Sequence, residues 1–598
     1  MQNQEPKRAV ETGSQRQAPS SPSRREFLGS VGGAAAVTIA AGAIGVEPLL
    51  GSKSSEARAI EIAPQGGIQR RDSAYQVRHQ AAIDEKNLGA FSQPTNGDEE
   101  AYPNRIGNFH KTLPHNSIGE VDSAAYNALL NALSTGDFND FENVPKGGTG
   151  EYANPMGGLA FNMEGPDSPA TTLVSVPFAI ASPERAAEMA ELYWEAYLRD
   201  VPFADYNTNP EVQEACDDLS AMQGYRGPRH PMSNNVTPQL LFRYDFPGAL
   251  DGPMVSQILY RTFTYDGITV VPQMRARQPV INWSADGTFT FDSLGRDFLT
   301  AFSEWLNAQN GVGVGNVSVF DGNRFIRSVR DLGHHAGSDT IVTSYTRAAL
   351  VLGGLGAVVD DGNPYKNSNR QGGFATFGAG HLHTLIGSAF KGERHAWYQK
   401  WNVHRHLRPE AYGGLVDNHL QGRATYPIPS DLLGSSVLTR IAAYNQHLNQ
   451  VRFGSNEASY LLAQELPGGS PSHPSAPAGH AITAGACVTI LKAWFKEDTV
   501  LSNAVTVKPN RDGTALLPYV AGVDGPPLTI GGELNKLAHN LSEGRNMSGV
   551  HWRVSDNITG LFQGEEVAIR LLREATATYP EPNAHFSLTK FDGTTITI

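Results

Sequence analysis

Segments with helical periodicity recur along the chain and constrain its fold more than any other feature. In the clearest segment, Ser182–Leu198, a serine and a proline precede apolar residues that are spaced three and four positions apart. Residues 121–133, 297–306 and 564–575 show the same spacing, and we expect each to form an amphipathic helix. The chain is therefore expected to be mainly α-helical.

Strand patterns are short by comparison. Alternating β-branched and aromatic residues occupy 268–271, 288–291 and 594–598. Loops rich in Gly, Pro and Asn, at 143–158 and 467–479, separate the helical stretches. We predict a helical bundle with long ordered loops and a few short β-hairpins.

The first 59 residues resemble an export signal. Paired arginines, Arg24 and Arg25, precede a Gly/Ala-rich apolar stretch, and Ala57-Arg58-Ala59 fits a signal-peptidase site. A twin-arginine signal implies export to the periplasm or the medium. A transmembrane helix is the alternative, but Gly and Ala make a weak bilayer span, so we expect no stable membrane insertion of the mature chain.

The rest of the chain is expected to divide into two halves. Residues 60–330 would form an N-terminal helical scaffold, and residues 331–598 would carry the chemistry. The net charge is −13, without a basic run beyond the N-terminal segment, which argues against binding to nucleic acid. Cys216 and Cys487 are too far apart for a CxxC metal site, and buried free thiols are favoured over a disulfide.

The first segment that could carry chemistry is residues 394–409. On a helix, Trp397, Lys400 or Trp401, His404 and Arg408 would share one face, because they recur at steps of three and four. Pro409 disfavours a helical conformation at Arg408. Cations beside an aromatic ring at a helix end could hold a tetrahedral anion; the alternative is a solvated basic face beside a packed Trp.

The second segment is residues 472–480, which lead into an apolar helix expected over Ala481–Phe495. A Gly-His pair at a helix start directs free backbone N–H groups and the positive end of the helix dipole towards a bound anion. The imidazole of His480 would then be placed for acid–base chemistry. A helix-capping loop without function is the alternative.

The third segment is residues 541–552. A helix built on Leu534, Leu537 and Leu541 would end near Gly549, with Arg545 in its last turn and His551 just beyond. Taken alone, His551 would more often be a hydrogen-bonded structural histidine than a metal ligand.

Taken together, the order Lys…Arg-Pro, Pro-x-Gly-His and Arg-x5-His resembles the signature of the vanadium haloperoxidase and acid phosphatase superfamily. Further stretches resemble algal-type vanadium bromoperoxidases and their bacterial relatives, so that the resemblance covers residues 70–598. These stretches are Gln93–Glu100, Leu113–His115, Asn154–Phe161, Glu164–Ser168, Leu198–Pro202 and Gly373–Gly378. The implied fold is that of a vanadium haloperoxidase. The implied activity is oxidation of bromide by hydrogen peroxide to hypohalous acid, which halogenates small organic nucleophiles; chloride and iodide are the alternative halides.

The resemblance also implies a vanadate cofactor and the residues that bind it. Lys400, Arg408 and Arg545 would hold the equatorial oxygens, and the backbone N–H of Gly479 would add a donor. His551 would bind vanadium directly.

Three further histidine and tryptophan roles follow from the same resemblance. His480 would hydrogen-bond the axial oxygen and take part in catalysis together with Lys400. His473 would adjust the acid–base behaviour of the site and, together with Trp397, line the halide pocket. Trp397 stands where the family's halide choice is set, and chloride-oxidising fungal members carry Trp there, so chloride oxidation is a hypothesis beside bromide oxidation.

Two positions depart from the family pattern. Ala478 replaces the usual Ser and removes a hydroxyl donor to vanadate, which predicts weaker retention of the cofactor or an altered rate. Asp556 follows His551 after four residues where three are usual, so an orienting role for Asp556 stays unassigned.

Alternatives remain at this stage. The same cationic residues fit phosphate, so an acid phosphatase with His551 as nucleophile is one, and a non-catalytic oxyanion-binding protein is another. Asp360 and Asp361 lie in an oxygen-rich loop that could bind structural calcium, with a plain turn as the alternative. Members of the family often form large homo-oligomers, so the resemblance implies that this chain does so too.

Overall fold

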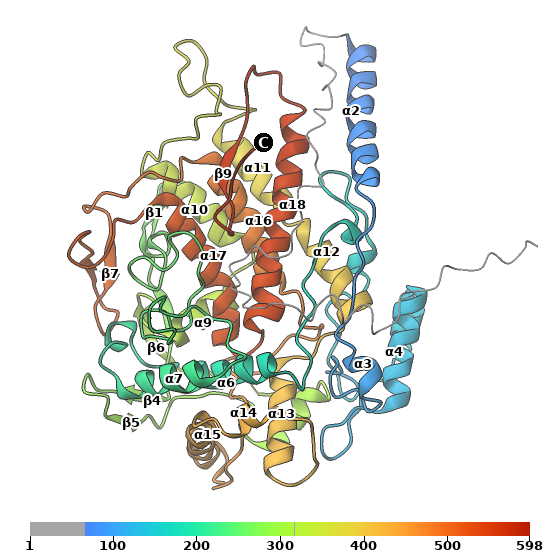
Figure 1. Ribbon diagram of the computed structural model, residues 1–598, viewed down its shortest axis with the longest axis vertical. Coiled ribbons are helices and arrows are strands. Elements are labelled where there is room, and N and C mark those ends of the chain that lie inside the picture. The colour runs from blue at the N-terminus through green and yellow to red at the C-terminus, as the bar shows by residue number, and fades with distance from the viewer. Residues whose placement is uncertain (1–65, 316) are drawn as a thin grey trace, which may run out of the picture. The chain divides into compact units, whose positions relative to one another are not determined.

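Helices dominate the computed structural model, which describes residues 66–315 and 317–598 (Figure 1). The α-helices are α2 (Gly67–Asn87), α3 (Asp98–Ala101), α4 (Ser123–Thr135), α5 (Phe138–Glu142), α6 (Pro183–Tyr197), α7 (Pro210–Ala221), α8 (Phe302–Gln309), α9 (Val329–Ser338), α10 (Thr343–Gly354), α11 (Ala379–Ala389), α12 (Gly392–Tyr398), α13 (Pro409–Leu420), α14 (Ser430–Leu433), α15 (Val437–Phe453), α16 (Gly479–Trp494), α17 (Ile530–Met547) and α18 (Thr559–Thr576). The mainly α-helical prediction is confirmed. The predicted twin-arginine segment lies outside the described residues.

The strands form short antiparallel pairs. They are β1 (Phe263–Tyr265) with β2 (Ile268–Val270), β3 (Met274–Arg277) with β6 (Phe320–Arg324), β4 (Ile281–Trp283) with β5 (Phe289–Phe291), β7 (Val507–Pro509) with β8 (Leu516–Pro518), and β9 (Ser587–Thr589) with β10 (Thr595–Thr597). All but the β3–β6 pair join consecutive strands as hairpins, as the sequence predicts.

Most predicted helices form, but one begins later than expected. Ser182 caps α6 by accepting a hydrogen bond from the backbone N–H of Arg185. The helix predicted from Asp297 starts only at Phe302. Asp297 is instead a fully buried ion-pair partner of Arg199 and Arg330, and this pairing outweighs the local helical pattern.

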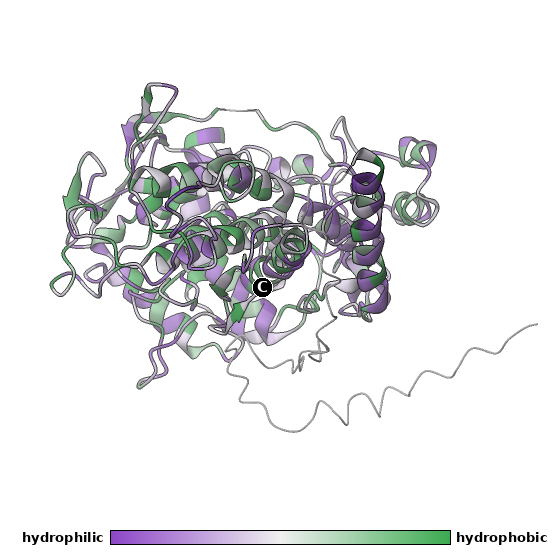
Figure 2. Cartoon of the chain, turned by 90° about the horizontal axis from the view of Figure 1, so that it is seen from above, coloured by the Kyte–Doolittle hydropathy of each residue, from purple (hydrophilic) through white to green (hydrophobic). Residues whose placement is uncertain are grey.

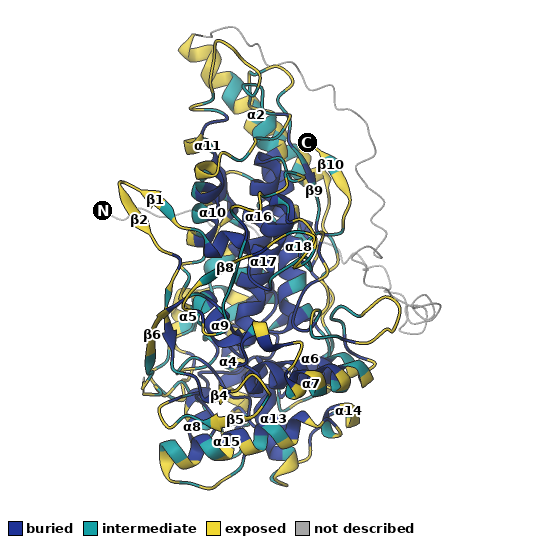
Figure 3. Cartoon of the chain, turned by 90° about the vertical axis from the view of Figure 1, so that its left-hand side faces the viewer, coloured by how far each residue is buried: buried dark blue, intermediate teal, exposed yellow. Residues whose placement is uncertain are grey.

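The core is centred on α16, which packs against α17 on one side and α18 on the other (Figures 1 and 3). Small residues allow close approach of the helices. A Cβ at Gly485 would lie 2.1 Å from the Leu561 carbonyl oxygen, and one at Gly564 would lie 2.0 Å from the Ile482 carbonyl oxygen. Larger side chains at these two positions would push α16 and α18 apart.

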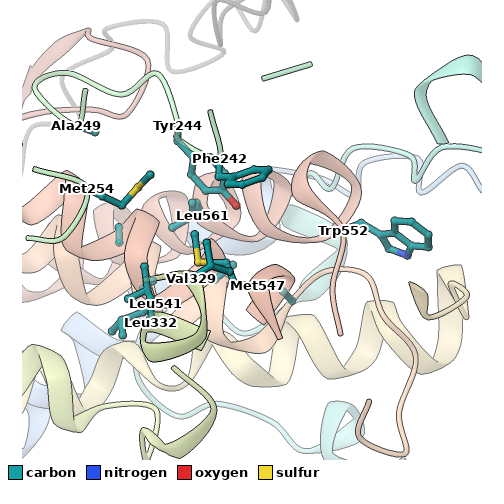
Figure 4. Close-up of a cluster of buried hydrophobic side chains, with 14 of the residues drawn as sticks. Phe242, Tyr244, Ala249, Met254, Val329, Leu332, Leu541, Met547, Trp552 and Leu561 are labelled. Carbon is teal, nitrogen blue, oxygen red and sulfur yellow. The ribbon is translucent and has the colours of Figure 1, made fainter. Parts of the chain in front are cut away.

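A second tight contact joins α9 to α17. Figure 4 shows Val329 and Leu332 of α9 beside Leu541 and Met547 of α17, all of them buried. This packing fixes the last turn of α17, where Arg545 lies. Seen from above, hydrophilic and hydrophobic residues are interspersed over the outer segments (Figure 2).

The two predicted halves share contacts across the boundary near residue 330. Helix α6 of the first half contacts α15 and α17 of the second. The division at 330 stays a prediction. Both cysteines are buried free thiols, as expected. Among the described residues, no helix combines the length and the hydropathy that a bilayer span requires.

Candidate functional site

Lys400 lies on a π-helix, η5 (Gln399–His404), that continues directly from α12. The backbone N–H of Arg405 donates to the carbonyl of Lys400 at 2.9 Å, a step of five residues. The predicted common face is only partly correct: Trp401 packs against Phe109 and Tyr152 in a hydrophobic cluster that Trp397 also contacts, whereas Arg408 lies beyond the end of this helix.

The side chain of Lys400 is fully buried and is held by main-chain oxygens. Its Nζ donates to the carbonyl of Ser475 at 2.7 Å and to that of Pro474 at 3.2 Å. Nζ also lies 5.7 Å from the centre of the Trp397 ring. The first and second sequence segments therefore meet at this lysine.

Arg408 is the N-cap residue of α13, with extended backbone angles, and Pro409 is the first helical residue. Exclusion of Arg408 from a helix is confirmed, but it precedes a new helix instead of ending one. Its guanidinium donates to the carbonyls of Val550 at 2.8 Å and His473 at 2.9 Å. It also contacts a ring nitrogen of His551 at 3.1 Å, which brings the third segment to the first.

The second segment leads into a helix, as predicted. Helix α16 begins at Gly479, Ala478 is its N-cap residue, and Ala478 offers no side-chain acceptor or donor. His480 hydrogen-bonds with the backbone of Ala336, and its Nε2 atom is buried without a partner among the described residues. Burial, and then the neighbouring Arg545 and Lys400, lower the pKa of His480 to about 3.

The third segment places Arg545 in the last turn of α17 and His551 four residues after the helix ends. Arg545 is buried, and its Nε atom has no partner among the described residues. Burial lowers its pKa to about 10, against the opposing charge of Glu465. The charge of Arg545 also acts on both Arg408 and His480, so the three segments converge.

His551 is oriented by Asp556, which the sequence left unassigned. His551 Nδ1 lies 2.7 Å from Asp556 Oδ2, and the backbone N–H of Trp552 donates to the same oxygen at 3.1 Å. Asp556 lies on a second π-helix, η6 (Arg553–Ile558), in which Asn557 N–H donates to the carbonyl of Trp552. The wider turn accounts for the one extra residue between the histidine and the aspartate.

Three further residues of this network were missed from the sequence. The Ser475 hydroxyl donates to Asp556, His406 Nδ1 contacts the other carboxylate oxygen at 3.2 Å, and Arg185 contacts His406 Nε2 at 2.7 Å. Burial raises the pKa of Asp556, but the hydrogen bonds and charges of His406 and His551 outweigh burial and hold that pKa well below its ordinary value. Ser475 could have been found, because it lies within the second segment; Arg185 has no local signal.

His473 and Trp397 lie beside the cations. Their rings are 4.9 Å apart, and the Arg408 guanidinium lies 2.9 Å from His473 Nδ1. Trp397 Nε1 donates to the carbonyl of Ala153 at 3.0 Å, which ties the ring to the loop over residues 143–158. The structure thus brings both predicted halide-pocket residues next to Lys400 and Arg408.

The electrostatics of the site are dominated by buried positive charge. Burial is the main cause that lowers the pKa of Arg408 to about 9 and that of Lys400 well below its ordinary value. Among the described residues, neither these two cations nor Arg545 forms a salt bridge with a carboxylate. Buried charge without a close counter-ion is costly, and a multiply charged oxyanion would offset it.

The predicted calcium residues do not join this site. Asp361 forms salt bridges with Lys366 and Lys496, and Asp360 accepts from the N–H of Gly362 in a turn. The N–H of Asp360 donates to the carbonyl of Trp494, at the far end of α16 from Gly479, about 24 Å away along the helix. In the described part of the chain, no three or more His, Cys, Asp or Glu residues gather to hold a metal ion, so the calcium hypothesis gains no support.

Comparison with known proteins supplies the family. Residues 439–580 match the family model described as the VCPO second helical-bundle domain. The chain is 37% identical over 549 residues to a vanadium-dependent bromoperoxidase of Ascophyllum nodosum, covering 88% of this chain and 92% of that protein. The chain belongs to the vanadium-dependent bromoperoxidase family.

Other members of the vanadium-dependent bromoperoxidase family agree with this assignment. A bromoperoxidase of Corallina pilulifera is 31% identical over 90% of this chain and 100% of its own length. A homohexameric structure of the second vanadate-dependent bromoperoxidase of Ascophyllum nodosum superposes with a TM-score of 0.80, at 33% identity, over 89% of this chain and 91% of that one. The family and the fold expected from the three segments are confirmed.

Proposed function

We propose that this bromoperoxidase-family chain oxidises bromide with hydrogen peroxide at a vanadate bound by Lys400, Arg408, Arg545 and the first turn of α16. The observation that carries the proposal is the set of three buried cations that have no close carboxylate partner in the described part of the chain. A vanadate anion would supply the missing negative charge, and guanidinium and ammonium groups are suited to its oxygens. The family assignment supports vanadate over other oxyanions.

His551 has the features expected of the single metal ligand. Its Nδ1 is engaged by Asp556, which leaves Nε2 as the coordinating atom, and Arg408 at 3.1 Å is the neighbour of that nitrogen. Bound vanadate would act as a Lewis acid without changing its oxidation state. The other cations would orient and polarise its oxygens.

His480 is the proposed proton acceptor. Its buried Nε2 has no partner among the described residues, and the ring is neutral near pH 7, so that Nε2 offers a lone pair to incoming peroxide. The negative charge of a bound anion would raise the pKa of His480 and make the ring a stronger proton acceptor. Lys400, whose ammonium group is held by two backbone carbonyls, would donate a hydrogen bond to an oxygen bound at the place where the peroxide enters. His473, between Trp397 and Arg408, would adjust proton transfer and halide binding.

Reconstitution tests this proposal directly. The purified apo-chain is incubated with orthovanadate, and oxidation of bromide and of chloride by hydrogen peroxide is followed through halogenation of monochlorodimedone. We expect vanadate-dependent turnover of bromide; the chloride arm tests the role proposed for Trp397. Hydrolysis of a phosphate monoester by the apo-chain, inhibited by vanadate and without peroxide-dependent halogenation, would support an acid phosphatase instead. Vanadate binding without either activity would support an oxyanion-binding protein.

The assembly and location of the chain are further proposals. The homohexameric relative supports a homo-oligomer, and the apolar side chains of Phe161, Met163 and Phe374 are almost fully exposed in the single chain. Light scattering coupled to size-exclusion chromatography would measure the mass. Export through the twin-arginine route is supported by residues 1–59 and is tested by replacing Arg24 and Arg25 with Lys and fractionating the cells.

A further inference from the structure

Glu393 is a buried carboxyl group that the proposed chemistry does not yet use. It lies in the first turn of α12, four residues before Trp397 and on the same side of this helix. Glu393 is 7% exposed. One oxygen, Oε1, accepts from the Thr483 hydroxyl at 2.7 Å. The other oxygen, Oε2, is buried and has no partner among the described residues.

The free oxygen lies against the first turn of α16. A Cβ built on Gly479 would be 2.7 Å from Glu393 Oε2 and 3.2 Å from the Trp397 ring. Thr483 is one turn after Gly479 and anchors the carboxyl group to the same side of α16. The unpartnered oxygen is thus next to the backbone that is proposed to bind the oxyanion, at the point where Ala478 contributes no side-chain donor.

We propose that Glu393 is a further oxyanion-binding residue, whose carboxyl group, in its acid form, donates a hydrogen bond to an anion bound at Gly479. This inference rests on the proposed function, because it needs an oxyanion at that place. An ionised carboxylate there would repel the anion, whereas a carboxylic acid supplies a donor. An unmade hydrogen bond on a buried oxygen is costly, and a bound anion would satisfy it.

The surroundings of Glu393 agree with the acid form. Burial raises its pKa to about 7, and the Thr483 hydrogen bond and the Lys400 charge oppose that rise. The competing interpretation is that Glu393 is an ionised counter-ion of Lys400. No salt bridge within 4 Å joins these two residues in the described chain; Lys400 donates to carbonyls instead.

Two substitutions of the full chain separate these interpretations. Glu393→Gln keeps a donor of similar shape, and Glu393→Leu removes it. Affinity of the apo-chain for orthovanadate is measured by isothermal titration calorimetry, without peroxide or halide. We expect Gln to stay within about threefold of wild type and Leu to lose about tenfold or more, the usual loss for one hydrogen bond to a charged group. Thr483→Val is the matched control for the anchoring contact and should cause a smaller loss.

The outcomes are distinct. Tighter binding by both Gln and Leu variants would identify an ionised counter-ion and overturn the inference, as would unchanged binding by the Leu variant. Absence of vanadate binding by wild type would instead refute the proposed function. Thermal unfolding of the apo-proteins adds a second readout. We expect Glu393→Leu to unfold at a higher temperature than wild type, because it removes an unpartnered buried oxygen, whereas a purely structural role for Glu393 predicts a lower temperature.

Discussion

The ring of His551 is fixed by the carboxylate of Asp556, with 2.7 Å between Nδ1 and Oδ2. The same carboxylate accepts from the Ser475 hydroxyl and from the Trp552 N–H. These contacts determine which nitrogen of His551 carries the proton and leave Nε2 directed towards Arg408. The histidine is therefore held in one orientation before any ligand binds.

Replacing Asp556 by Asn should weaken vanadate binding. The orienting carboxylate also raises the basicity of the ligand, and loss of such a partner typically costs about 10- to 100-fold in metal affinity. Equilibrium dialysis with orthovanadate measures the change. Ser475→Ala, which removes one hydrogen bond to Asp556 and leaves the histidine contact, should lose less. Equal affinity of Asp556→Asn and wild type would contradict the orienting role.

The three buried cations should make the apo-protein respond strongly to oxyanions. Vanadate at 100 times its dissociation constant should stabilise the folded chain by about 2.7 kcal/mol, seen as a higher unfolding temperature. Arg545→Met should raise the unfolding temperature of the apo-protein, because it removes a buried charge, and should reduce the vanadate response. Arg226→Met, at a half-exposed pair with Glu184, is the control. If vanadate raised the unfolding temperature of Arg545→Met as much as that of wild type, the proposed role of Arg545 in vanadate binding would be contradicted.

The apo-protein should lose stability on acidification through His480. Its pKa is about 3 in the folded chain, below the ordinary value of 6.5, so the unfolded chain binds the proton first. Above pH 6.5 the ring is neutral in both states and does not oppose folding. As the pH falls from 6.5 towards 3, protonation of His480 in the unfolded chain lowers the free energy of unfolding, by about 3 kcal/mol at pH 4. We expect His480→Gln to flatten the fall of the urea midpoint between pH 7 and pH 4. The exposed His79→Gln should leave that fall unchanged, and an identical fall in both variants would refute the prediction.

Gly479 should not tolerate a side chain. An added Cβ would lie 2.7 Å from the anchored carboxyl of Glu393 and 3.2 Å from the Trp397 ring, so Gly479→Ala should destabilise the chain by about 1–3 kcal/mol. Gly387→Ala is the matched control, since Gly387 lies within α11 with open space around it and should gain about 0.5–1 kcal/mol. Urea unfolding measures both, and the prediction fails if the two variants shift in the same direction.

The sequence predicted the residues whose roles depend on short spacing. Arg408 before Pro409, and Gly479 with His480 at a helix start, can be interpreted locally because backbone rules fix their conformation. Asp556 could not be assigned, since a π-helix, which periodicity does not reveal, changes its distance from His551. Asp297 was wrongly placed in a helix.

Asp297 and Glu393 illustrate the limit in physical terms. The conformation of Asp297 depends on ion pairs with two arginines that are distant in sequence. The position of the Glu393 carboxyl group depends on its hydrogen bond with Thr483 on another helix. Neither contact can be recognised from the local sequence. Several tertiary interactions acting together can outweigh the local helix propensity.

The main-chain carbonyls that hold Lys400 and Arg408 have a consequence for how the pocket can change. These cations donate hydrogen bonds to the backbone carbonyls of Pro474, Ser475, His473 and Val550, and every amino acid has such a carbonyl. A substitution at such a position changes the side chain beside the proposed halide pocket, while the backbone contacts to Lys400 and Arg408 are retained. Directed evolution of halide or substrate selectivity would therefore start best at His473, because its carbonyl would still accept from Arg408 after the imidazole is replaced.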